Sequence, residues 1–219
     1  MGQAVLQALP YMLGGIFYTI GITLIALAVG FIIGMMLALM RIYGGKPAQW
    51  ISATYVVVLR GFPSLVVLFI VYFILAASIN LPPFLAGCVA LGVCSSAYQA
   101  EIFRGAIQSV PPGQMIAARA LGMANTQAII TVVLPQALRN AIPGWSNEAA
   151  VIVKDSSLVY AVGLAELLRR AQQVSARLYA PLLVYSVTAL LYFLLTFGTN
   201  RLLSMVEENV RIPEIGEAR

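Results

Sequence analysis

The side chains best able to do chemistry in this sequence lie in apolar segments. Glu148 follows Asn147 in such a segment, shortly after the dipeptide Pro143-Gly144. An ionisable group buried in a bilayer costs several kcal/mol, so it is a functional candidate by default. A carboxylate at Glu148 could bind the ammonium or guanidinium group of a substrate. The alternative is an ion pair between Glu148 and Lys154 or an arginine of another helix, and the sequence leaves both open.

A second group of polar side chains lies in the apolar segment that ends near residue 107. Ser95, Ser96 and Tyr98 offer hydroxyl groups, although a serine in a membrane helix often bonds only its own backbone. Glu101 and Arg104 are spaced to pair on one helix face, and a purely structural ion pair is the alternative. The predicted substrate contacts are Asn147, Glu148, Ser95, Ser96, Tyr98, Glu101, Arg104 and Lys154.

The residue types that are missing exclude most enzymatic chemistry. The chain has no histidine, which excludes Ser–His dyads and histidine-based zinc sites. Asp155 is its only aspartate, which excludes a pair of catalytic aspartates. Neither Lys46 nor Lys154 lies in the glycine-rich context of a phosphate-binding loop. We therefore expect no catalysis, no ATP site, no cofactor and no metal in this chain.

Composition indicates an integral membrane protein. Hydrophobic residues make up 61% of the 219 residues and charged residues only 10%, with a mean hydropathy of +0.91, whereas soluble domains are about 25% charged. The charge-free stretches exceed the roughly 20 residues that cross a bilayer as a helix. We predict an all-α membrane protein of one domain (1–219) with about five transmembrane helices, at 13–40, 64–78, 84–107, 135–153 and 181–200.

Prolines and small residues refine this prediction. Pro63 should bend or break the helical piece that begins at Trp50, and Pro143-Gly144 should interrupt the fourth span. The first span carries a small residue at every fourth position, which favours close packing against another helix. These small residues are Ala26, Gly30, Gly34 and Ala38.

Basic residues predict the orientation. The net charge is +5, but eleven of the thirteen basic residues are arginines scattered along the chain, which indicates membrane topology rather than nucleic-acid binding. With the amino terminus outside, nine basic residues fall on the inner side and four on the outer side. We therefore expect an external amino terminus, an internal carboxy terminus and an internal loop at 111–134.

The loop at 111–134 differs in character from its surroundings. A short helix from Gln114 to Leu121 should end at Gly122, a natural C-cap residue. A second short helix should begin with Asn125 as its N-cap and end at Leu134-Pro135. Neither piece is apolar enough to be committed to lipid.

The same loop carries a spaced motif. It contains Ala117-Ala118, Gly122 and Leu134-Pro135, with Val132 two residues before Leu134 and Ile116 before the alanines. This spacing resembles the cytoplasmic signature of binding-protein-dependent ABC importer permeases, which reads Glu-Ala-Ala, three residues, Gly, nine residues, Ile, one residue, Leu-Pro. Val132 replaces the isoleucine of that signature and Ile116 replaces its glutamate. Three further stretches resemble the polar amino acid branch: Arg60-Gly61-x-Pro63, Tyr98-x-x-Glu101-Ile102-x-Arg104-Gly105-x-Ile107 and Lys154-Asp155-Ser156-Ser157-Leu158.

The resemblance implies a type I ABC importer fold in a prokaryotic inner membrane. It also implies partners: ATP-binding cassette ATPase subunits that bind ATP and Mg, a second permease subunit (a copy or a related chain), and an external amino acid-binding protein. In that family the short helix docks in a groove of the ATPase and transmits its motion. The coupling residues implied here are Gly113, Gln114, Ala117, Ala118, Arg119, Leu121 and Gly122.

Two function classes follow from these expectations. The first is the permease subunit of an ABC importer for a polar, potentially basic, amino acid. The second is a stand-alone secondary transporter or channel, against which stand the lack of an internal repeat and the loop motif. Co-purification with an ATPase separates the two.

Overall fold

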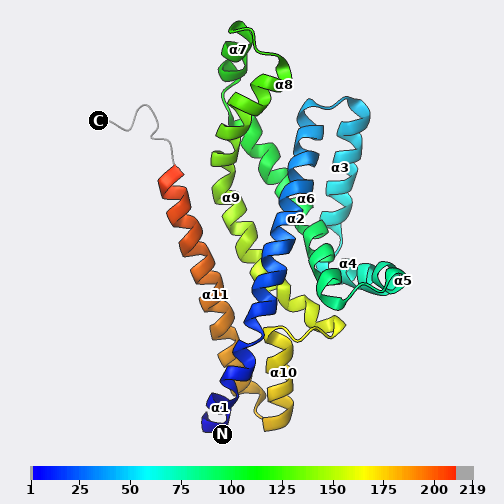
Figure 1. The fold of residues 1–219 in the computed structure, drawn as a ribbon, viewed down its shortest axis with the longest axis vertical. Helices are drawn as coiled ribbons and strands as arrows, with labels where there is room; N and C mark the ends of the chain where they lie inside the picture. Colours follow the sequence, from blue (N-terminus) through cyan, green and yellow to red (C-terminus); the bar gives the residue numbers. More distant parts are fainter. Residues whose placement is uncertain (1, 211–219) are drawn as a thin grey trace.

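Residues 2–210 of the computed structural model are described, and this range holds helices and short connections but no strand. The helices are α1 (Gly2–Leu13), α2 (Ile16–Tyr43), α3 (Lys46–Gly61), α4 (Ser64–Ile70), a π-helical stretch (Val71–Ala76), α5 (Ala77–Ile79), α6 (Pro83–Ser109), α7 (Pro112–Ala120), α8 (Asn125–Ala128), a second π-helical stretch (Ile129–Val133), α9 (Leu134–Asp155), a 3-10 helix (Ser156–Val162), α10 (Leu167–Leu178) and α11 (Pro181–Val210). Figure 1 shows an elongated bundle. We call the tip that holds α7 and α8 the α7 end, and the opposite tip with α1 and α10 the α10 end.

Helices α2 and α6 form the centre of the bundle. Ala26 and Ala38 of α2 are almost wholly buried, and Gly30 and Gly34 are buried between them. A Cβ on Gly34 would lie 2.9 Å from Cβ of Gln99 on α6, so only a residue without a side chain fits there. The predicted stripe of small residues is therefore a site of close helix packing.

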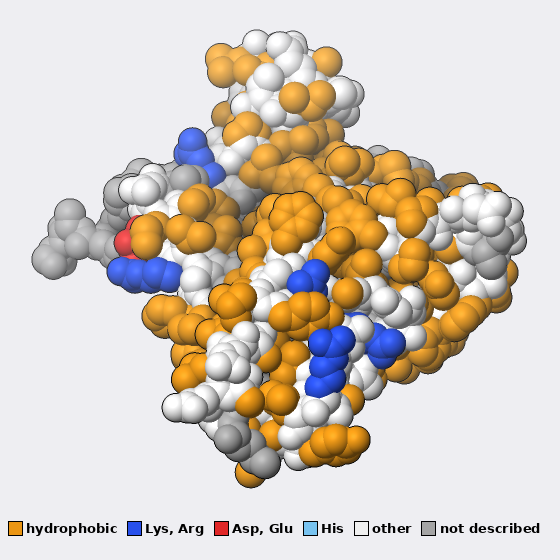
Figure 2. Space-filling view, turned by 60° about the horizontal axis from the view of Figure 1, so that its bottom comes forward, with side chains coloured by type: hydrophobic (Ala, Val, Ile, Leu, Met, Phe, Trp, Pro, Cys, Tyr) orange, Lys and Arg blue, Asp and Glu red, His pale blue; other side chains and the backbone are white. Residues whose placement is uncertain are grey.

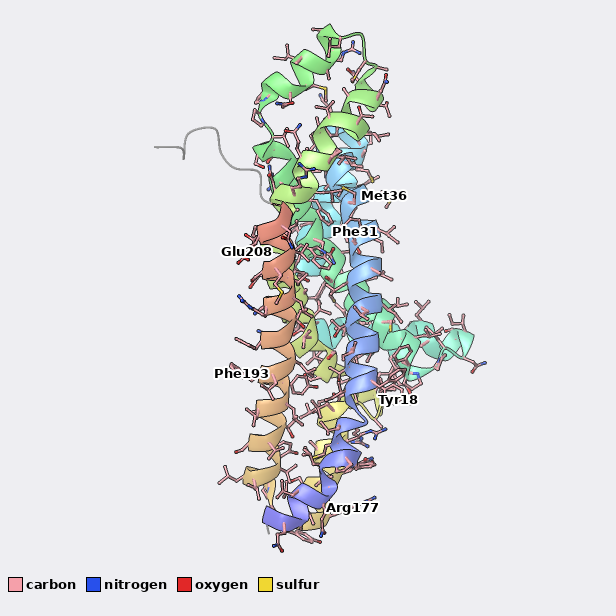
Figure 3. The ribbon with its side chains drawn as sticks, turned by 60° about the vertical axis from the view of Figure 1, so that its left-hand side comes forward. Tyr18, Phe31, Met36, Arg177, Phe193 and Glu208 are labelled. Carbon is pink, nitrogen blue, oxygen red and sulfur yellow. The ribbon has the colours of Figure 1, made fainter. Side chains whose placement is uncertain are left out.

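Within residues 2–210, three stretches are long and apolar enough to cross a membrane, namely Gly2–Tyr43, Pro83–Ser109 and Pro181–Asn209. The last two contain the predicted spans at 84–107 and 181–200, and α11 continues about ten residues beyond the predicted end. Large apolar side chains are exposed along these helices, with Phe17 78% and Phe193 62% accessible. Figure 2 shows one face of the molecule, on which hydrophobic side chains predominate, and Figure 3 shows side chains pointing outward from α2 and α11. Such a surface suits a chain surrounded by hydrocarbon.

The segment predicted as the second span, 64–78, is helical along its whole length. It consists of α4, the first π-helical stretch and most of α5, and it projects sideways from the bundle (Figure 1). Pro63 has an extended backbone, with φ −60° and ψ 134°, and the chain turns there by 104° between α3 and the stretch that begins with α4. The predicted bend at Pro63 is confirmed, and the bent pair counts as at most one span.

The predicted interruption at Pro143-Gly144 is wrong, because α9 is continuous from Leu134 to Asp155. Pro143 lies on an exposed face, and Gly144 lets α9 approach Ile102 of α6. The packing of α9 against α6 thus outweighs the cost of an internal proline, which is about 3 kcal/mol. With four charged residues, α9 is less apolar than the other long helices and is not a span by composition alone.

The short helix at 125–134 does not end at Leu134-Pro135 either. It runs from α8 through the second π-helical stretch directly into α9. Proline lacks an N–H and clashes with the carbonyl four residues earlier. The wider π-helical turn lies just before Pro135, where it accommodates both effects. The side chain of Asn125 makes no capping bond, and Ala124 occupies the cap position.

Candidate functional site

A cavity of about 220 Å³ opens between α4, α6 and α9. Four of the predicted substrate contacts line it: Ser95, Tyr98, Asn147 and Glu148. The remaining lining residues are Ser64, Cys94, Val151, Ile152 and Asp155. The structure thus assembles half of the predicted contacts into one site, although residues 95–98 and 147–148 lie about fifty positions apart in the chain.

Glu148 is the most buried charged residue of the cavity, with 6% of its surface accessible. The hydroxyl of Ser95 donates a hydrogen bond to its Oε1 over 2.7 Å. Within residues 2–210 the sole side-chain ion pair joins Glu101 and Arg104. The alternative in which Glu148 pairs with Lys154 or an arginine is therefore wrong for this part of the chain.

Asp155 gives the cavity a second carboxylate that the sequence reasoning missed. It lies seven residues after Glu148 on α9, and seven residues are almost two full helical turns. Both carboxylates therefore lie on the same face of the helix, a signal that the spacing alone already contained. In the part of the chain that the structure describes, no lysine or arginine lines the cavity, so the cavity favours a positively charged group on its ligand.

Tyr98 lies at an accessible edge of this cavity, with 41% of its surface exposed. The guanidinium carbon of Arg60, at the end of α3, lies 5.1 Å from the centre of the Tyr98 ring. This distance is that of a cation–π contact. The contact brings the end of α3 next to the cavity wall.

Three of the predicted contacts lie elsewhere. The hydroxyl of Ser96 donates to the Val93 carbonyl over 2.7 Å and lies 2.8 Å from the Tyr55 hydroxyl, so it links α6 to α3. Glu101 and Arg104 form the predicted ion pair at 2.6 Å. Neither of these two residues lines the cavity.

Lys154 is the fourth predicted contact outside the cavity. Its side chain is exposed and lines a separate shallow pocket beside Tyr185 and Tyr192 of α11. The prediction that Lys154 belongs with Glu148 is corrected, because adjacent positions on a helix point in different directions whereas Asp155 shares the face of Glu148.

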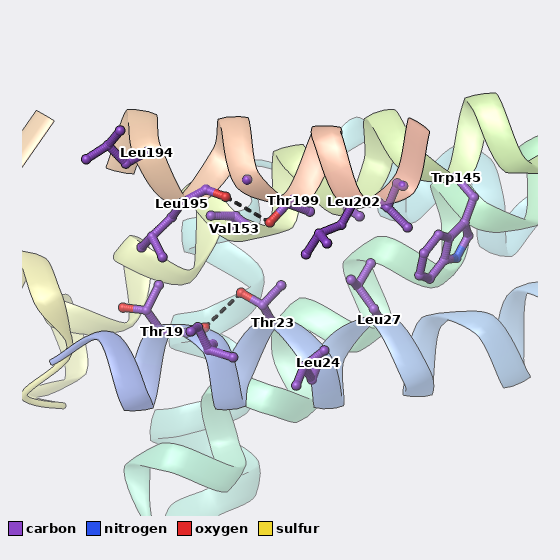
Figure 4. A pocket seen from close by; sticks show the side chains of 14 residues that line it. Thr19, Thr23, Leu24, Leu27, Trp145, Val153, Leu194, Leu195, Thr199 and Leu202 are labelled. Atoms are coloured by element: carbon purple, nitrogen blue, oxygen red, sulfur yellow. Dashed lines mark hydrogen bonds between the residues drawn. The ribbon is translucent and has the colours of Figure 1, made fainter. Parts of the chain in front are cut away.

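A larger, apolar pocket of about 440 Å³ separates α11 from α2 and α9 (Figure 4). Leu24, Leu27, Trp145 and Leu202 contribute apolar side chains to it. Thr23 and Thr199 also line it, but each hydroxyl donates to its own helix, at Thr19 and Leu195. This pocket therefore offers few polar groups to a ligand.

The α7 end carries a compact helical hairpin. Gly122 has φ +85°, and the backbone N–H groups of Gly122 and Met123 bond the carbonyls of Arg119 (3.0 Å) and Ala118 (3.2 Å). These two backbone hydrogen bonds, together with a glycine in the left-handed conformation, end a helix sharply. The predicted end of the short helix at Gly122 is confirmed.

The predicted coupling residues differ in exposure. Ala118 is buried with 3% accessibility, so it packs inside the hairpin and does not face a partner. The exposed members are Gly113, Gln114, Ala117, Arg119, Leu121 and Gly122. Ile116, which replaces the glutamate of the motif, is 68% accessible, and Leu121 is 80% accessible. The hairpin thus presents an apolar tip.

The α10 end is held by Glu166, which is wholly buried. Its carboxylate accepts bonds from the backbone N–H groups of Leu168 (2.7 Å) and Arg169 (2.6 Å) and from the Tyr192 hydroxyl (2.8 Å). Glu166 therefore caps α10 and ties it to α11. Burial raises the pKa of the Glu166 carboxyl above its ordinary value, although these bonds act in the opposite direction.

Comparison with known proteins places this geometry in context. Residues 30–212 match the family described as binding-protein-dependent transport system inner membrane component. The L-cystine transport system permease protein TcyB of Bacillus subtilis is 38% identical over 90% of this chain and 84% of its own length. The glutamine transport system permease protein GlnP of Escherichia coli is 34% identical over 96% of this chain and 97% of its own.

Solved structures give the same result. A chain from the crystal structure of an amino acid ABC transporter with histidines is 36% identical, with a TM-score of 0.83 over 93% of this chain and 96% of its own. A chain of the inward-facing MetNI methionine ABC transporter is 20% identical, with a TM-score of 0.80 over 92% of this chain and 97% of its own, and it shares the fold.

Proposed function

The chain belongs to the family of binding-protein-dependent transport system inner membrane components, and we propose that it is the permease subunit of an ABC importer for a polar amino acid that carries a positive group. In this role it performs no covalent chemistry. ATP and Mg are bound and ATP is hydrolysed by separate ATP-binding cassette subunits. A solute-binding protein delivers the amino acid from outside, and the complex resides in a prokaryotic inner membrane.

The observation that carries the substrate class is the cavity between α4, α6 and α9. Two carboxylates, Glu148 and Asp155, line it together with the hydroxyls of Ser64, Ser95 and Tyr98 and the amide of Asn147. Every amino acid has an ammonium group, and basic amino acids have a second cation. Among residues 2–210 no lysine or arginine lines this cavity, and its paired carboxylates suit such groups.

The proposed topology has five crossings and one permease domain, 1–219. Helix α2, the bent pair α3–α4, α6, α9 and α11 make the crossings, with the α10 end outside and the α7 end inside. The distribution of basic residues supports this orientation, since eight of thirteen fall on the proposed inner side and four on the outer side, while Arg60 lies at the bend of the α3–α4 crossing. Although α9 is polar, its charged residues face the cavity or the ends of the helix, where polar groups in membrane proteins are tolerated.

The proposed coupling element is the hairpin 111–134. Ile116 and Leu121 form an apolar tip that would insert into a groove of the ATPase, with Gly113, Gln114, Ala117 and Arg119 around it. Ala118 and Gly122 hold the shape of the tip from within. Motion of the ATPase would then reach α9 without a flexible joint, because α8 continues into α9.

Two permease subunits would form one pathway, and a related chain could replace the second copy. The exposed apolar faces of the bundle leave room for such a partner as well as for lipid. Alternating access would follow from closure and opening of the paired ATPase subunits.

Reconstitution tests the proposal. The purified permease should retain an ATPase subunit, and the complex should hydrolyse ATP faster when the ligand-loaded binding protein is added. The alternative of a stand-alone transporter predicts amino acid uptake into proteoliposomes that contain this chain alone, and that result would refute the proposed function.

A further inference from the structure

Gln99 is wholly buried where α2, α6 and α9 meet. Its Nε2 donates to the Leu27 carbonyl (3.2 Å) and to Oγ of Ser95 (3.0 Å), and its Oε1 accepts from Nε1 of Trp145 (2.8 Å). An indole N–H can only donate and a backbone carbonyl can only accept, so these partners fix which way the amide points. Gln99 therefore has one orientation, set by three helices.

Ser95 behaves unlike several other hydroxyl residues in the helices of this chain. The usual bond of such a residue runs to the carbonyl four positions earlier, and it is made by Thr23, Ser78, Thr188 and Thr199. Ser95 instead donates to Oε1 of Glu148 over 2.7 Å. Because Nε2 of Gln99 can only donate, it occupies a lone pair of the Ser95 oxygen and leaves the hydroxyl hydrogen for Glu148.

These bonds form a chain of donors that all point the same way. It runs from the Trp145 indole N–H to Gln99, from the Gln99 amide to Ser95, and from the Ser95 hydroxyl to the Glu148 carboxylate. Successive hydrogen bonds in a low-dielectric interior polarise one another, which favours a charged acceptor at the end of the chain. Ser95 engages only Oε1, which leaves Oε2 of Glu148 for a ligand.

We infer that Gln99 is a positioning residue for the substrate cavity: it directs the Ser95 hydroxyl onto Glu148 and so fixes the carboxylate that receives the cationic group of the amino acid. This inference rests on the proposed function. Gln99 does not line the cavity itself and acts through Ser95. Without the amide, the Ser95 hydroxyl is free to turn to the carbonyl of its own helix, as its counterparts do.

Gly30 supports the same assignment. A Cβ at this position of α2 would collide with Nε2 of Gln99. The absence of a side chain therefore makes the space in which the amide reaches Leu27 and Ser95. Gly30→Ala should displace the amide and reproduce the loss seen when Gln99 is replaced.

Direct binding tests the inference without the binding protein. The purified permease–ATPase complex in detergent would be titrated with radiolabelled L-arginine and L-glutamine. Gln99→Met keeps the length of the side chain and removes its hydrogen bonds, and it should weaken arginine binding by about five- to tenfold, as expected for a perturbed bond to a charged group. The matched control is Gln108→Met on the exposed face of the same helix, which should leave the Kd unchanged.

The double variant identifies the route of the effect. If Gln99 acts through the carboxylate, Gln99→Met combined with Glu148→Gln should bind arginine no more weakly than Glu148→Gln alone. The inference would be overturned if the double variant lost arginine affinity by the product of the two single-variant losses. It would also be overturned by an unchanged Kd in Gln99→Met, or by a wild-type complex that binds neither arginine nor glutamine. Should Gln99→Met fail to fold, Trp145→Phe removes the first donor while keeping an aromatic ring, and it should show the same coupling to Glu148→Gln with a smaller effect.

ATP-driven amino acid uptake by the same wild-type complex distinguishes a failure of the positioning role from a failure of the proposed function. If the wild-type complex takes up the amino acid but Gln99→Met binds arginine with an unaltered Kd, the positioning role is refuted and the proposed function stands. Absence of ATP-driven uptake of any amino acid by the wild-type complex refutes the proposed function itself.

Discussion

The hydroxyl of Ser95 on α6 lies 2.7 Å from the carboxylate of Glu148 on α9, and this bond joins two helices at the wall of an acidic cavity. Cys94 and Tyr98 from α6 and Asn147 and Asp155 from α9 extend the same wall. The bond therefore connects the packing of the bundle to the groups that would bind an amino acid.

Replacing Glu148 by Gln removes the charge and keeps the shape of the side chain. We expect the affinity of the permease complex for arginine to fall by roughly tenfold, which corresponds to about 1.4 kcal/mol, and the affinity for glutamine to fall less, because glutamine has one cationic group fewer. Direct binding of the two labelled amino acids measures this. Equal losses for both would remove Glu148 from substrate recognition.

Asp155→Asn should also lower the affinity of the permease complex for arginine, because Asp155 lines the same cavity as Glu148. Its neighbour provides the control, since Lys154 lines a different pocket and Lys154→Gln should leave arginine affinity within about twofold of wild type. Competition binding with arginine distinguishes the two variants. A large loss in Lys154→Gln together with none in Asp155→Asn would contradict the assignment of the cavity.

Leu121→Asp should weaken docking of the ATPase, because it places a charge at the apolar tip of the hairpin. We expect less ATPase to co-purify with the permease while its melting temperature in detergent stays the same, since Leu121 is 80% accessible. Ala117→Ser, a small change on the same exposed surface, is the control. Full retention of the ATPase by Leu121→Asp would argue against the proposed coupling role.

The buried carboxyl of Glu166 should make the stability of the folded protein depend on pH. Burial raises the pKa of its carboxyl, so the folded protein binds the proton more tightly than the unfolded chain does. This contribution to stability is complete below the unfolded pKa of about 4.3 and is lost as pH rises through the higher folded value. The melting temperature of wild type should fall relative to that of Glu166→Gln as pH rises from about 4.5 toward 7.

The control for this pH experiment is Glu208→Gln, which changes an exposed carboxylate on α11. Its melting temperature should follow that of wild type across the same range. A constant difference between wild type and Glu166→Gln at every pH would show that burial does not govern this carboxyl.

The sequence predicted the parts of this fold that depend on local patterns. The uncharged stretches located α6 and the start of α11, the spacing of Gly30 and Gly34 indicated a close helix contact, and Gly122 marked a helix end. These features depend on hydrophobic burial or on backbone sterics within a few residues, which a sequence displays directly.

The errors arose where distant contacts or backbone adjustments override local rules. Pro143 and Pro135 were expected to end helices, but packing on α6 and a π-helical turn let α9 continue through both. In the site, the alternative partner of Glu148 was Lys154 or an arginine of another helix, whereas its bond comes from Ser95, fifty-three residues away. The role of Gln99 could not be found in the sequence, because its partners lie on three helices.

The central claim is that a separate ATPase subunit drives an amino acid through this chain, and ATP-dependent uptake tests it most directly. Proteoliposomes would contain the permease with its ATPase, and labelled arginine or glutamine would be added outside with the binding protein. We predict uptake that requires ATP inside the vesicles and stops when a non-hydrolysable ATP analogue replaces it. Uptake at the same rate without ATP, or without the ATPase subunit, would contradict the account.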